Sequence, residues 1–348
     1  MEAFTYKSIG AKVIFGKPLI PSLKEELKGG KSRNIGVIAS KRNAPILEEI
    51  SNFQEVDTLV HFDQVAQHVP DALVKEALDF FEKDKPDLIL AVGGGSAIGL
   101  AKALVLERKM EFWAVPTTYS GSEMTNIYGI SYQGKKVVKR DDRVHPHRIF
   151  YDPELSMGLP LGLAVPSAFN ALAHLLEALY SVEKNPLIES MTEMGIKELL
   201  EGLKALSTRG KLDEATNRKL LFGAYVGGKV LSEVSMGLHH KTAHVLGGNF
   251  GLDHAKTHTL ILPYVLKYQW PYLDSSIRSA FQLLFQDEQP YASILNLQQQ
   301  MGVDFKLRDL GMKEDSLEEA VSYLMDMHYS NPAPLDTEKL LEMLKEAY

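Results

Sequence analysis

The chain has 348 residues, of which 45% are hydrophobic and 24% are charged, a composition typical of globular proteins, and its length predicts two domains. Its formal net charge of −7 gives no electrostatic footprint for nucleic acid or for a membrane surface. The absence of cysteine excludes disulfides, thiolate catalysis, zinc–thiolate sites and iron–sulfur clusters, so any metal would have to bind His, Asp, Glu or other oxygen ligands.

The first residues lack a basic segment followed by an apolar one, so we expect no signal peptide and a cytoplasmic protein. After them, short apolar runs alternate with helical patterns. The alternation predicts an α/β fold with a parallel sheet and helices on both faces, a Rossmann-like domain. Strands are expected at 34–40, 56–62, 87–92, 112–118 and 148–155, helices at 70–83 and from the glycines at 93–95 to Leu106, and a hairpin at 128–140 that turns at Gln133-Gly134.

From Leu159 onward strand patterns almost vanish and apolar residues recur with helical spacing. This change predicts an all-helical second domain. We place a dinucleotide-binding domain at 1–157 and a helical substrate or catalytic domain at 158–348.

AVGGGSAIGLAKAL (91–104) places three glycines and a serine between a predicted strand and a predicted helix. Glycines let a backbone approach a pyrophosphate at a helix N-terminus, so a nucleotide is favoured over a glycine-rich turn without a ligand. VPTTYSGSEMTN (115–126) follows the next strand, at the sheet edge where such folds bind ligands. The strand that ends at Ser40 carries no acid there to repel a 2′-phosphate, so NADPH should be tolerated as well as NADH. The predicted cofactor-binding residues are Ser40, Gly93, Gly94, Gly95, Ser96, Thr117, Thr118, Ser122 and Lys136.

Histidines are concentrated in residues 237–258, GLHHKTAHVLGGNFGLDHAKTH. His240 and His244 have the i, i+4 spacing that puts two side chains on one helical face, and Asn170 and His174 repeat it on another predicted helix. A single histidine of this kind is more often a hydrogen-bonded core residue than a ligand. Two such pairs in one domain favour a functional site, for which Glu177 is expected to be a supporting or structural carboxylate.

These motifs resemble the iron-containing alcohol dehydrogenase superfamily and, within it, the maleylacetate reductases. The resemblance covers nearly the whole chain. It implies the fold shared with dehydroquinate synthase, a site in the cleft between the two domains, a homodimer, and reduction of maleylacetate to 3-oxoadipate by NADH or NADPH. It rests on GGGSAIGLAKA, PTTYSGSEMTNIYGI, the YDPEL…GLP junction, NALAH, GLHHKTAHVLGGNFGLDHAKTH and NPAPLD.

Metal-dependent members of the family hold Fe²⁺ or Zn²⁺ with an Asp and three His. The His positions match His174, His240 and His254, but the Asp position matches Asn170. A neutral amide lacks the charge that hard cations seek, so we expect no metal; if one binds, those three histidines would hold it. Asp253, before His254, could alternatively supply a carboxylate or raise the pKa of that histidine.

The chemistry that the resemblance implies does not require a metal. Hydride can add to the C=C bond conjugated to the ketone of maleylacetate, and hydrogen-bond donors can stabilise the resulting enolate. We assign substrate binding to Lys241, with Tyr119 and His239 as weaker candidates for contacting this small dicarboxylate. The predicted catalytic residues are His174, His240, His244, His254 and Asn170.

Three other functions stay open at this point. The first is a metal-dependent alcohol dehydrogenase of the same superfamily. The second is a cyclising lyase like 3-dehydroquinate synthase, which would not consume NADH. The third is a non-catalytic NAD(P)-binding protein.

Overall fold

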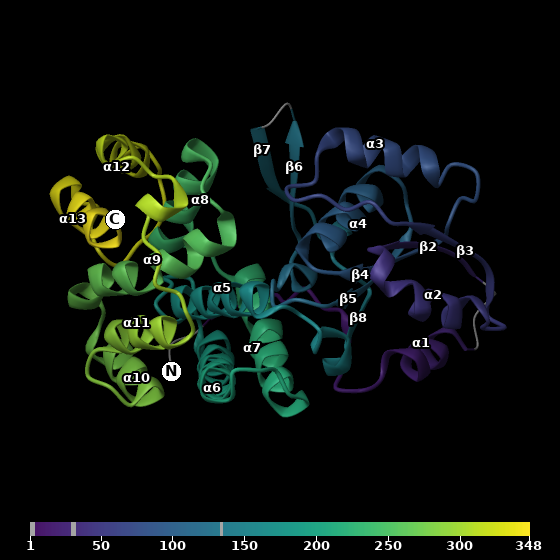
Figure 1. Cartoon of the computed structure of the whole chain (residues 1–348), viewed down its shortest axis with the longest axis horizontal. Helices are drawn as coiled ribbons and strands as arrows, with labels where there is room; N and C mark the ends of the chain where they lie inside the picture. Colours follow the sequence, from purple (N-terminus) through teal and green to yellow (C-terminus); the bar gives the residue numbers. More distant parts are fainter. Residues whose placement is uncertain (1–3, 29–32, 133–134) are drawn as a thin grey trace. The chain divides into compact units, whose positions relative to one another are not determined.

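The computed structural model describes residues 4–28, 33–132 and 135–348, with Arg42, Lys135 and Lys136 described by their main chain alone. The chain divides into two compact units (Figure 1). One comprises Tyr6–Leu159, and the other comprises Pro160–Tyr348 with Met1–Thr5. We call them the α/β unit and the helical unit.

The α/β unit is built on a six-stranded sheet in which every neighbouring pair is parallel. Its order is β1-β8-β5-β4-β2-β3. The central strand β4 is buried along its whole length, as expected for a parallel strand covered on both faces. The strands are β1 (Lys12–Phe15), β2 (Arg33–Ala39), β3 (Val56–Phe62), β4 (Leu88–Gly93), β5 (Glu111–Pro116) and β8 (Arg148–Tyr151).

Helices cover both faces of this sheet (Figure 1). α1 (Leu19–Leu27) and α2 (Ala44–Ser51) join β2, β4, β5 and β8 in one hydrophobic core. α3 (Asp71–Phe80) and α4 (Gly95–Glu107) lie on the opposite side. β6 (Ile127–Tyr132) and β7 (Lys135–Arg140) form the expected antiparallel hairpin, whose predicted turn lies outside the described residues.

The α/β fold and the parallel sheet are confirmed, but three elements were not foreseen. They are β1, α1 and α2, which are short. The last strand also ends earlier than predicted, at Tyr151, because Asp152 accepts hydrogen bonds from the main-chain N–H groups of Glu154 and Leu19 and opens a 3₁₀ turn.

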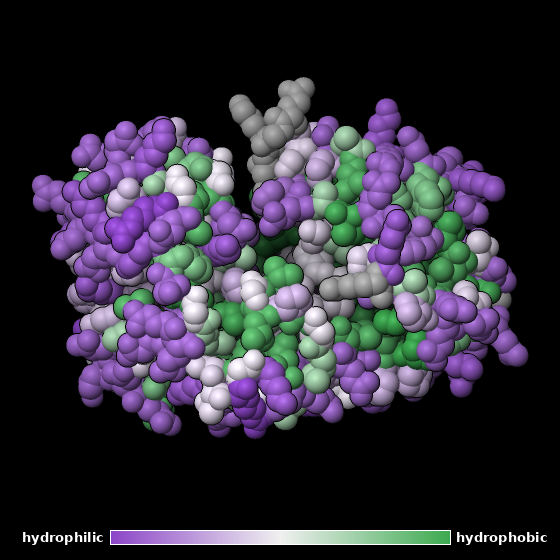
Figure 2. All heavy atoms as spheres, viewed as in Figure 1, coloured by the Kyte–Doolittle hydropathy of each residue, from purple (hydrophilic) through white to green (hydrophobic). Residues whose placement is uncertain are grey.

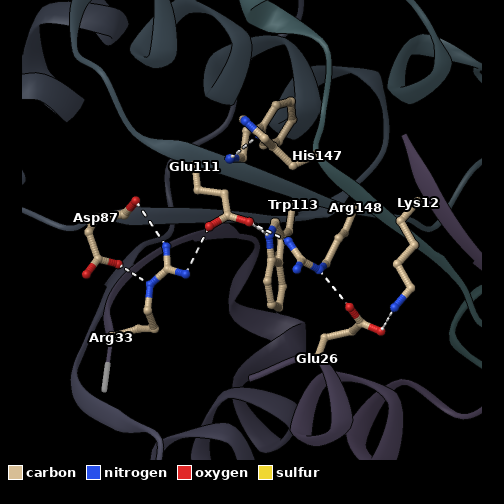
Figure 3. A network of polar contacts seen from close by, with 9 residues as sticks. Lys12, Glu26, Arg33, Asp87, Glu111, Trp113, His147 and Arg148 are labelled. Carbon is tan, nitrogen blue, oxygen red and sulfur yellow. Dashed lines mark hydrogen bonds and ion pairs between the residues drawn. The ribbon is translucent and has the colours of Figure 1, made fainter. Parts of the chain in front are cut away.

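Charged side chains link the amino ends of four strands and α1 (Figure 3). Arg33 of β2 pairs with Asp87 and with Glu111 of β5, and Glu111 also binds Arg148 of β8. Arg148 reaches Glu26 of α1, which binds Lys12 of β1. We call this alternating series the amino-edge network.

The helical unit contains no strand among its described residues. Its central helix is α5, and glycines of α7 allow close packing around it. A Cβ on Gly227 would lie 3.0 Å from the carbonyl oxygen of Ala171 in α5, and one on Gly223 would lie 2.3 Å from Cγ of Leu199 in α6. The helices are α5 (Leu161–Leu179), α6 (Pro186–Arg209), α7 (Glu214–Glu233), α8 (Leu238–Phe250), α9 (His254–Gln269), α10 (Ser275–Phe285), α11 (Pro290–Gln300), α12 (Leu317–Met325) and α13 (Thr337–Ala347).

The outer helices are amphipathic, as their sequence pattern predicts. α12 and α13 contribute Leu317, Leu324 and Leu340 to one buried core with α8 and α9. On the face shown in Figure 2, hydrophilic side chains cover most of α12 and α13.

By length and composition alone, α5 is apolar enough to cross a bilayer. Within the helical unit 72% of the relevant window is buried. Burial of this extent is what the central helix of a packed bundle shows.

Candidate active site

The predicted cofactor residues gather at the carboxyl edge of the sheet. Ser40 follows β2, Gly93–Gly95 end β4 and begin α4, and Thr117 follows β5. These three strands are neighbours. β3 is the neighbour of β2 on one side, and the next strand in the chain, β4, is its neighbour on the other side. The order in which strands are added to the sheet therefore reverses between β2 and β4. Open α/β sheets bind ligands at such a switch point.

The glycine turn lies directly against the hydroxyl-rich loop 117–126. The N–H of Thr117 donates to the carbonyl of Gly93 at 3.0 Å. A Cβ on Gly94 would lie 2.8 Å from Cγ2 and 2.9 Å from Oγ1 of Thr118, closer than side-chain atoms approach one another. Glycine at position 94 is therefore required for this contact.

The first turn of α4 fits a phosphate. Gly94 is its N-cap, no side chain in the described chain caps it, and the turn carries no acidic residue. Its N–H groups and the positive end of the helix dipole can therefore face an anion. Ser96 in this turn, Thr118 against it, and Ser122 in the same loop as Thr118 are half-buried.

Two predicted residues of the α/β unit are placed differently from this group. Tyr119 is fully buried, so it offers no surface to a substrate in this conformation, and burial raises its pKa. Lys136 lies on β7, but its side chain is outside the described part of the chain.

In the helical unit the predicted histidines come together. The rings of His174 and His240 are stacked with centroids 4.9 Å apart, and those of His244 and His254 are stacked at 6.0 Å. His258 lies between these pairs, 4.9 Å from His240 and 4.4 Å from His254. We call six residues the histidine cluster: His174, His239, His240, His244, His254 and His258.

Exposure differs within the cluster. His174, His239, His240 and His258 are buried, His254 is half-buried and His244 is exposed. Nε2 of His239 lies 3.1 Å from Nδ1 of His258, which forms a buried imidazole pair. His239 therefore packs within the core of this unit rather than presenting its ring to solvent.

Glu177 supports the cluster from α5. Its carboxylate accepts hydrogen bonds from the main-chain N–H groups of His239 at 2.8 Å and of His240 at 3.4 Å. Oε2 also lies 2.5 Å from Nδ1 of His240. Glu177 thus caps α8 through its side chain, a supporting contact; burial raises the pKa of this carboxyl, and the hydrogen bonds from the N–H groups of α8 oppose that shift.

Burial sets the ionisation of the cluster. It lowers the pKa values of His174, His240 and His258 well below the ordinary value, and neighbouring imidazoles add to the effect. Burial, followed by the proximity of His240, lowers the pKa of His239 to about 3. The four buried imidazoles are therefore neutral near neutral pH.

Several polar atoms at the cluster have no hydrogen-bond partner among the described residues. They are Oδ1 of Asn170, Nδ1 of His174, Nδ1 of His239, Nε2 of His240 and Nε2 of His258, all buried. Buried polar atoms are nearly always paired, so such a group is typical of a site that receives a ligand.

The donor set does not fit a divalent cation as it is arranged. Within the described residues, no group of three or more His, Cys, Asp or Glu side chains could hold a metal ion. Asn170 is neutral, and Asp253 is engaged elsewhere, because its side chain caps α9 by accepting from the N–H of Lys256 at 2.8 Å.

Lys241 follows His240 in the first turn of α8 and is half-buried, with Nζ 5.9 Å from the ring centroid of Tyr329. His258 is a member of the cluster for which no role was predicted from the sequence. Its signal was the i, i+4 spacing from His254, which places both rings on one face of α9.

Comparison with known proteins gives matches over nearly the whole chain. A family model described as iron-containing alcohol dehydrogenase matches residues 10–153, and one described as Fe-containing alcohol dehydrogenase family, C-terminal, matches residues 164–348.

A maleylacetate reductase of Pseudomonas sp. (strain P51) is 36% identical over 345 residues, spanning 99% of this chain and 97% of that protein. A maleylacetate reductase of Burkholderia cepacia is 35% identical, spanning 100% and 98%. The crystal structure of maleylacetate reductase from Agrobacterium tumefaciens has a TM-score of 0.92 at 28% identity, with 100% of this chain and 99% of that chain covered.

Proposed function

The chain belongs to the iron-containing alcohol dehydrogenase family and is an oxidoreductase, and from this premise we propose that it reduces the conjugated C=C bond of maleylacetate. The product is 3-oxoadipate, the hydride donor is NADH or NADPH, and no metal ion takes part. The proposal includes a cytoplasmic homodimer that binds a small dicarboxylate.

The observation that carries the metal-free proposal is the neutral side chain of Asn170 next to neutral imidazoles. An anionic ligand strengthens the binding of Fe²⁺ or Zn²⁺ to a set of histidines, and the neutral Asn170 does not supply one. Asn170 and the buried histidines instead offer uncharged hydrogen-bonding atoms without partners in the described chain. Oδ1 of Asn170 and an unprotonated ring nitrogen can accept a hydrogen bond from a substrate or a water molecule, and a protonated ring nitrogen can donate one to a substrate oxygen.

The histidine cluster and Asn170 would act on the substrate oxygen and on the proton. NAD(P)H held at Gly93–Gly95 and Thr117–Thr118 would supply the hydride that adds to the alkene carbon, which would leave the conjugated ketone of the substrate as an enolate. The amide N–H of Asn170 or an imidazole N–H donates to that oxygen. His244, the exposed imidazole, takes a proton from water and delivers it to the carbon that completes the reduction.

Lys241 would bind one substrate carboxylate. It directly follows His240 in sequence and is half-buried. An ammonium paired with a carboxylate forms a charge-assisted hydrogen bond, which is stronger than a neutral one.

The test follows loss of NADH or NADPH absorbance with maleylacetate, with and without EDTA, on protein whose metal content has been measured. We expect stoichiometric oxidation of cofactor at a rate that EDTA does not change. Absence of turnover with either cofactor would overturn the substrate assignment, and EDTA-sensitive turnover would overturn the metal-free mechanism.

One observation favours a metal-dependent alcohol dehydrogenase as the second candidate. Glu177 accepts a hydrogen bond from Nδ1 of His240, and Nε2 of the same ring has no partner in the described chain. Metal-binding histidines are commonly oriented by a carboxylate in this way. Oxidation of simple alcohols by protein loaded with Fe²⁺ or Zn²⁺ would support this candidate instead.

A further inference from the structure

Lys102 is a fully buried lysine in the middle of α4, the helix that begins at the glycine turn. Lysine is almost never fully buried unless its charge is paired. Its Nζ donates to the carbonyl oxygens of Ser122 at 2.6 Å, Thr125 at 2.8 Å and Ile127 at 2.7 Å, and lies 2.9 Å from Oγ1 of Thr125. Three carbonyls need three N–H donors, which only the protonated amine has.

A buried carboxyl group interacts with this charge: burial raises the pKa of Glu123, and the charge of Lys102 opposes that shift. Glu123 lies in the same loop and interacts electrostatically with Lys102, and its Oε1 accepts a hydrogen bond from the hydroxyl of Tyr151 at 2.7 Å. Burial lowers the pKa of Lys102 to about 7, and the charge of Glu123 opposes this shift. The ammonium group is therefore retained by its oxygen partners and not by water.

The loop that Lys102 holds is the one that meets the glycine turn. At its start, Thr117 bonds to Gly93 and Thr118 packs against Gly94. At its end, Ser122–Ile127 converge on Lys102. Both ends of the loop are thus tied to the β4–α4 segment, which fixes where Thr118 and Ser122 lie relative to the N-terminus of α4.

We propose that Lys102 is a positioning residue for the cofactor: by gathering the carbonyls of Ser122, Thr125 and Ile127 it holds the hydroxyl-rich loop against the phosphate-binding turn. Lys102 is enclosed in protein and acts through the loop, not on the cofactor itself. The inference rests on the proposed function insofar as that loop binds NAD(P)H.

The test compares Lys102→Met with Leu104→Ala and with the double variant Lys102→Met/Glu123→Gln. Leu104 is also fully buried in α4, about 200° around the helix from Lys102, so Leu104→Ala perturbs the helix without removing the loop contact. Lys102→Met leaves Glu123 buried without its cation, which can prevent folding. The double variant removes both charges and keeps the core neutral.

The Kd of NADH is measured by fluorescence titration without substrate, together with kcat at saturating NADH and the KM of maleylacetate. We expect the double variant to bind NADH about tenfold more weakly or worse, with kcat within about threefold and an unchanged KM for maleylacetate. Leu104→Ala should lower the melting temperature and leave the Kd of NADH unchanged.

A folded double variant with the Kd of the wild type would overturn the proposal, as would equal weakening of NADH binding in Leu104→Ala. Failure of the proposed function gives a different result. If the wild-type protein binds NADH but does not reduce maleylacetate, only the substrate assignment is overturned. If it binds neither NADH nor NADPH, the proposed function and the role of Lys102 are both overturned.

Discussion

Oε2 of Glu177, near the C-terminal end of α5, lies 2.5 Å from Nδ1 of His240 in the first turn of α8. The same carboxylate accepts the N–H groups of His239 and His240, so it caps α8 from another helix. With the carboxylate as acceptor, the ring proton of His240 is on Nδ1 and the lone pair is on Nε2, the buried atom without a partner. One side chain thus sets both the start of α8 and the tautomer of His240.

The substitution Glu177→Gln should therefore affect catalysis more than cofactor binding. The amide nitrogen cannot accept the hydrogen bonds that one carboxylate oxygen receives, so an N–H group of α8 loses its partner at a cost of about 1–3 kcal/mol. Because the orientation of His240 is lost with it, we expect kcat to fall by about 10–100-fold. Steady-state kinetics and urea denaturation measure the two effects.

Glu183→Gln is the matched control. Glu183 also accepts hydrogen bonds from a main-chain N–H and a side chain, those of Ser235, but at an exposed site. It should leave kcat unchanged. A kcat for Glu177→Gln equal to that of this control would show that the Glu177–His240 contact has no catalytic role.

The substitution Asn170→Asp tests why the donor set does not fit a metal. A carboxylate at this position would supply the missing anion beside His174, so we expect affinity for Zn²⁺ to rise by at least about tenfold. The added negative charge should at the same time slow maleylacetate reduction, because it opposes formation of an enolate and binding of a dicarboxylate. Isothermal titration with Zn²⁺ and the NADH assay provide the measurements.

In Asn170→Asp/His240→Ala the gain in Zn²⁺ affinity should disappear, since one of the expected ligands is removed. If Asn170→Asp binds Zn²⁺ no better than the wild type, the charge at position 170 does not control metal binding, and the explanation offered for the metal-free mechanism fails.

Local patterns were sufficient to predict the cofactor half of the site. The glycines at 93–95 and the strand before them are recognisable because the turn, the buried strand and the helix are continuous in sequence. β1 was not predictable in this way, since it has four residues and pairs only with β8, more than a hundred residues later. The β8 segment was recognised from its own apolar run, but four residues are too few for β1 to show a strand pattern of its own.

The features of the histidine cluster that the sequence did not predict depend on contacts between helices. That Glu177 caps α8 depends on how α5 and α8 pack, which the spacing of Glu177 from His174 does not indicate. Sequence also shows that His239 and His240 are adjacent, but not that both rings are buried. Lys102 is recognisable in the sequence as the single cation of the apolar helix GSAIGLAKALVLE, but only the glycine motif of this segment was interpreted.

The substitution Ser40→Asp should shift cofactor preference toward NADH. Ser40 lies at the carboxyl end of β2, beside the switch point, where an acid binds the ribose 2′-OH of NADH and repels the 2′-phosphate of NADPH. We expect the KM of NADPH to rise by at least about tenfold and that of NADH to stay within about threefold. Ser40→Asn, which adds similar bulk without charge, is the control. An equal rise for both cofactors would place the ribose elsewhere.

The amino-edge network should make stability depend on pH on the acid side (Figure 3). Burial alone would raise the pKa of Glu111, but hydrogen bonds from Trp113 and Arg33, with the charges of Arg33 and Arg148, outweigh it and hold the pKa below 4.5. A carboxyl whose pKa is lowered by folding stabilises the native state above its unfolded pKa and loses that contribution as the pH falls through its folded pKa.

Glu111→Gln should accordingly reduce the free energy of unfolding at about pH 7, and the difference from the wild type should shrink as the pH falls below about 4.5. Glu25→Gln, at an exposed position on α1, should change the free energy of unfolding little at either pH. Urea denaturation at a series of pH values measures both. A Glu111→Gln deficit that stays constant down to about pH 3 would mean that Glu111 stabilises the sheet through packing rather than through its charge, because a packing contribution does not titrate.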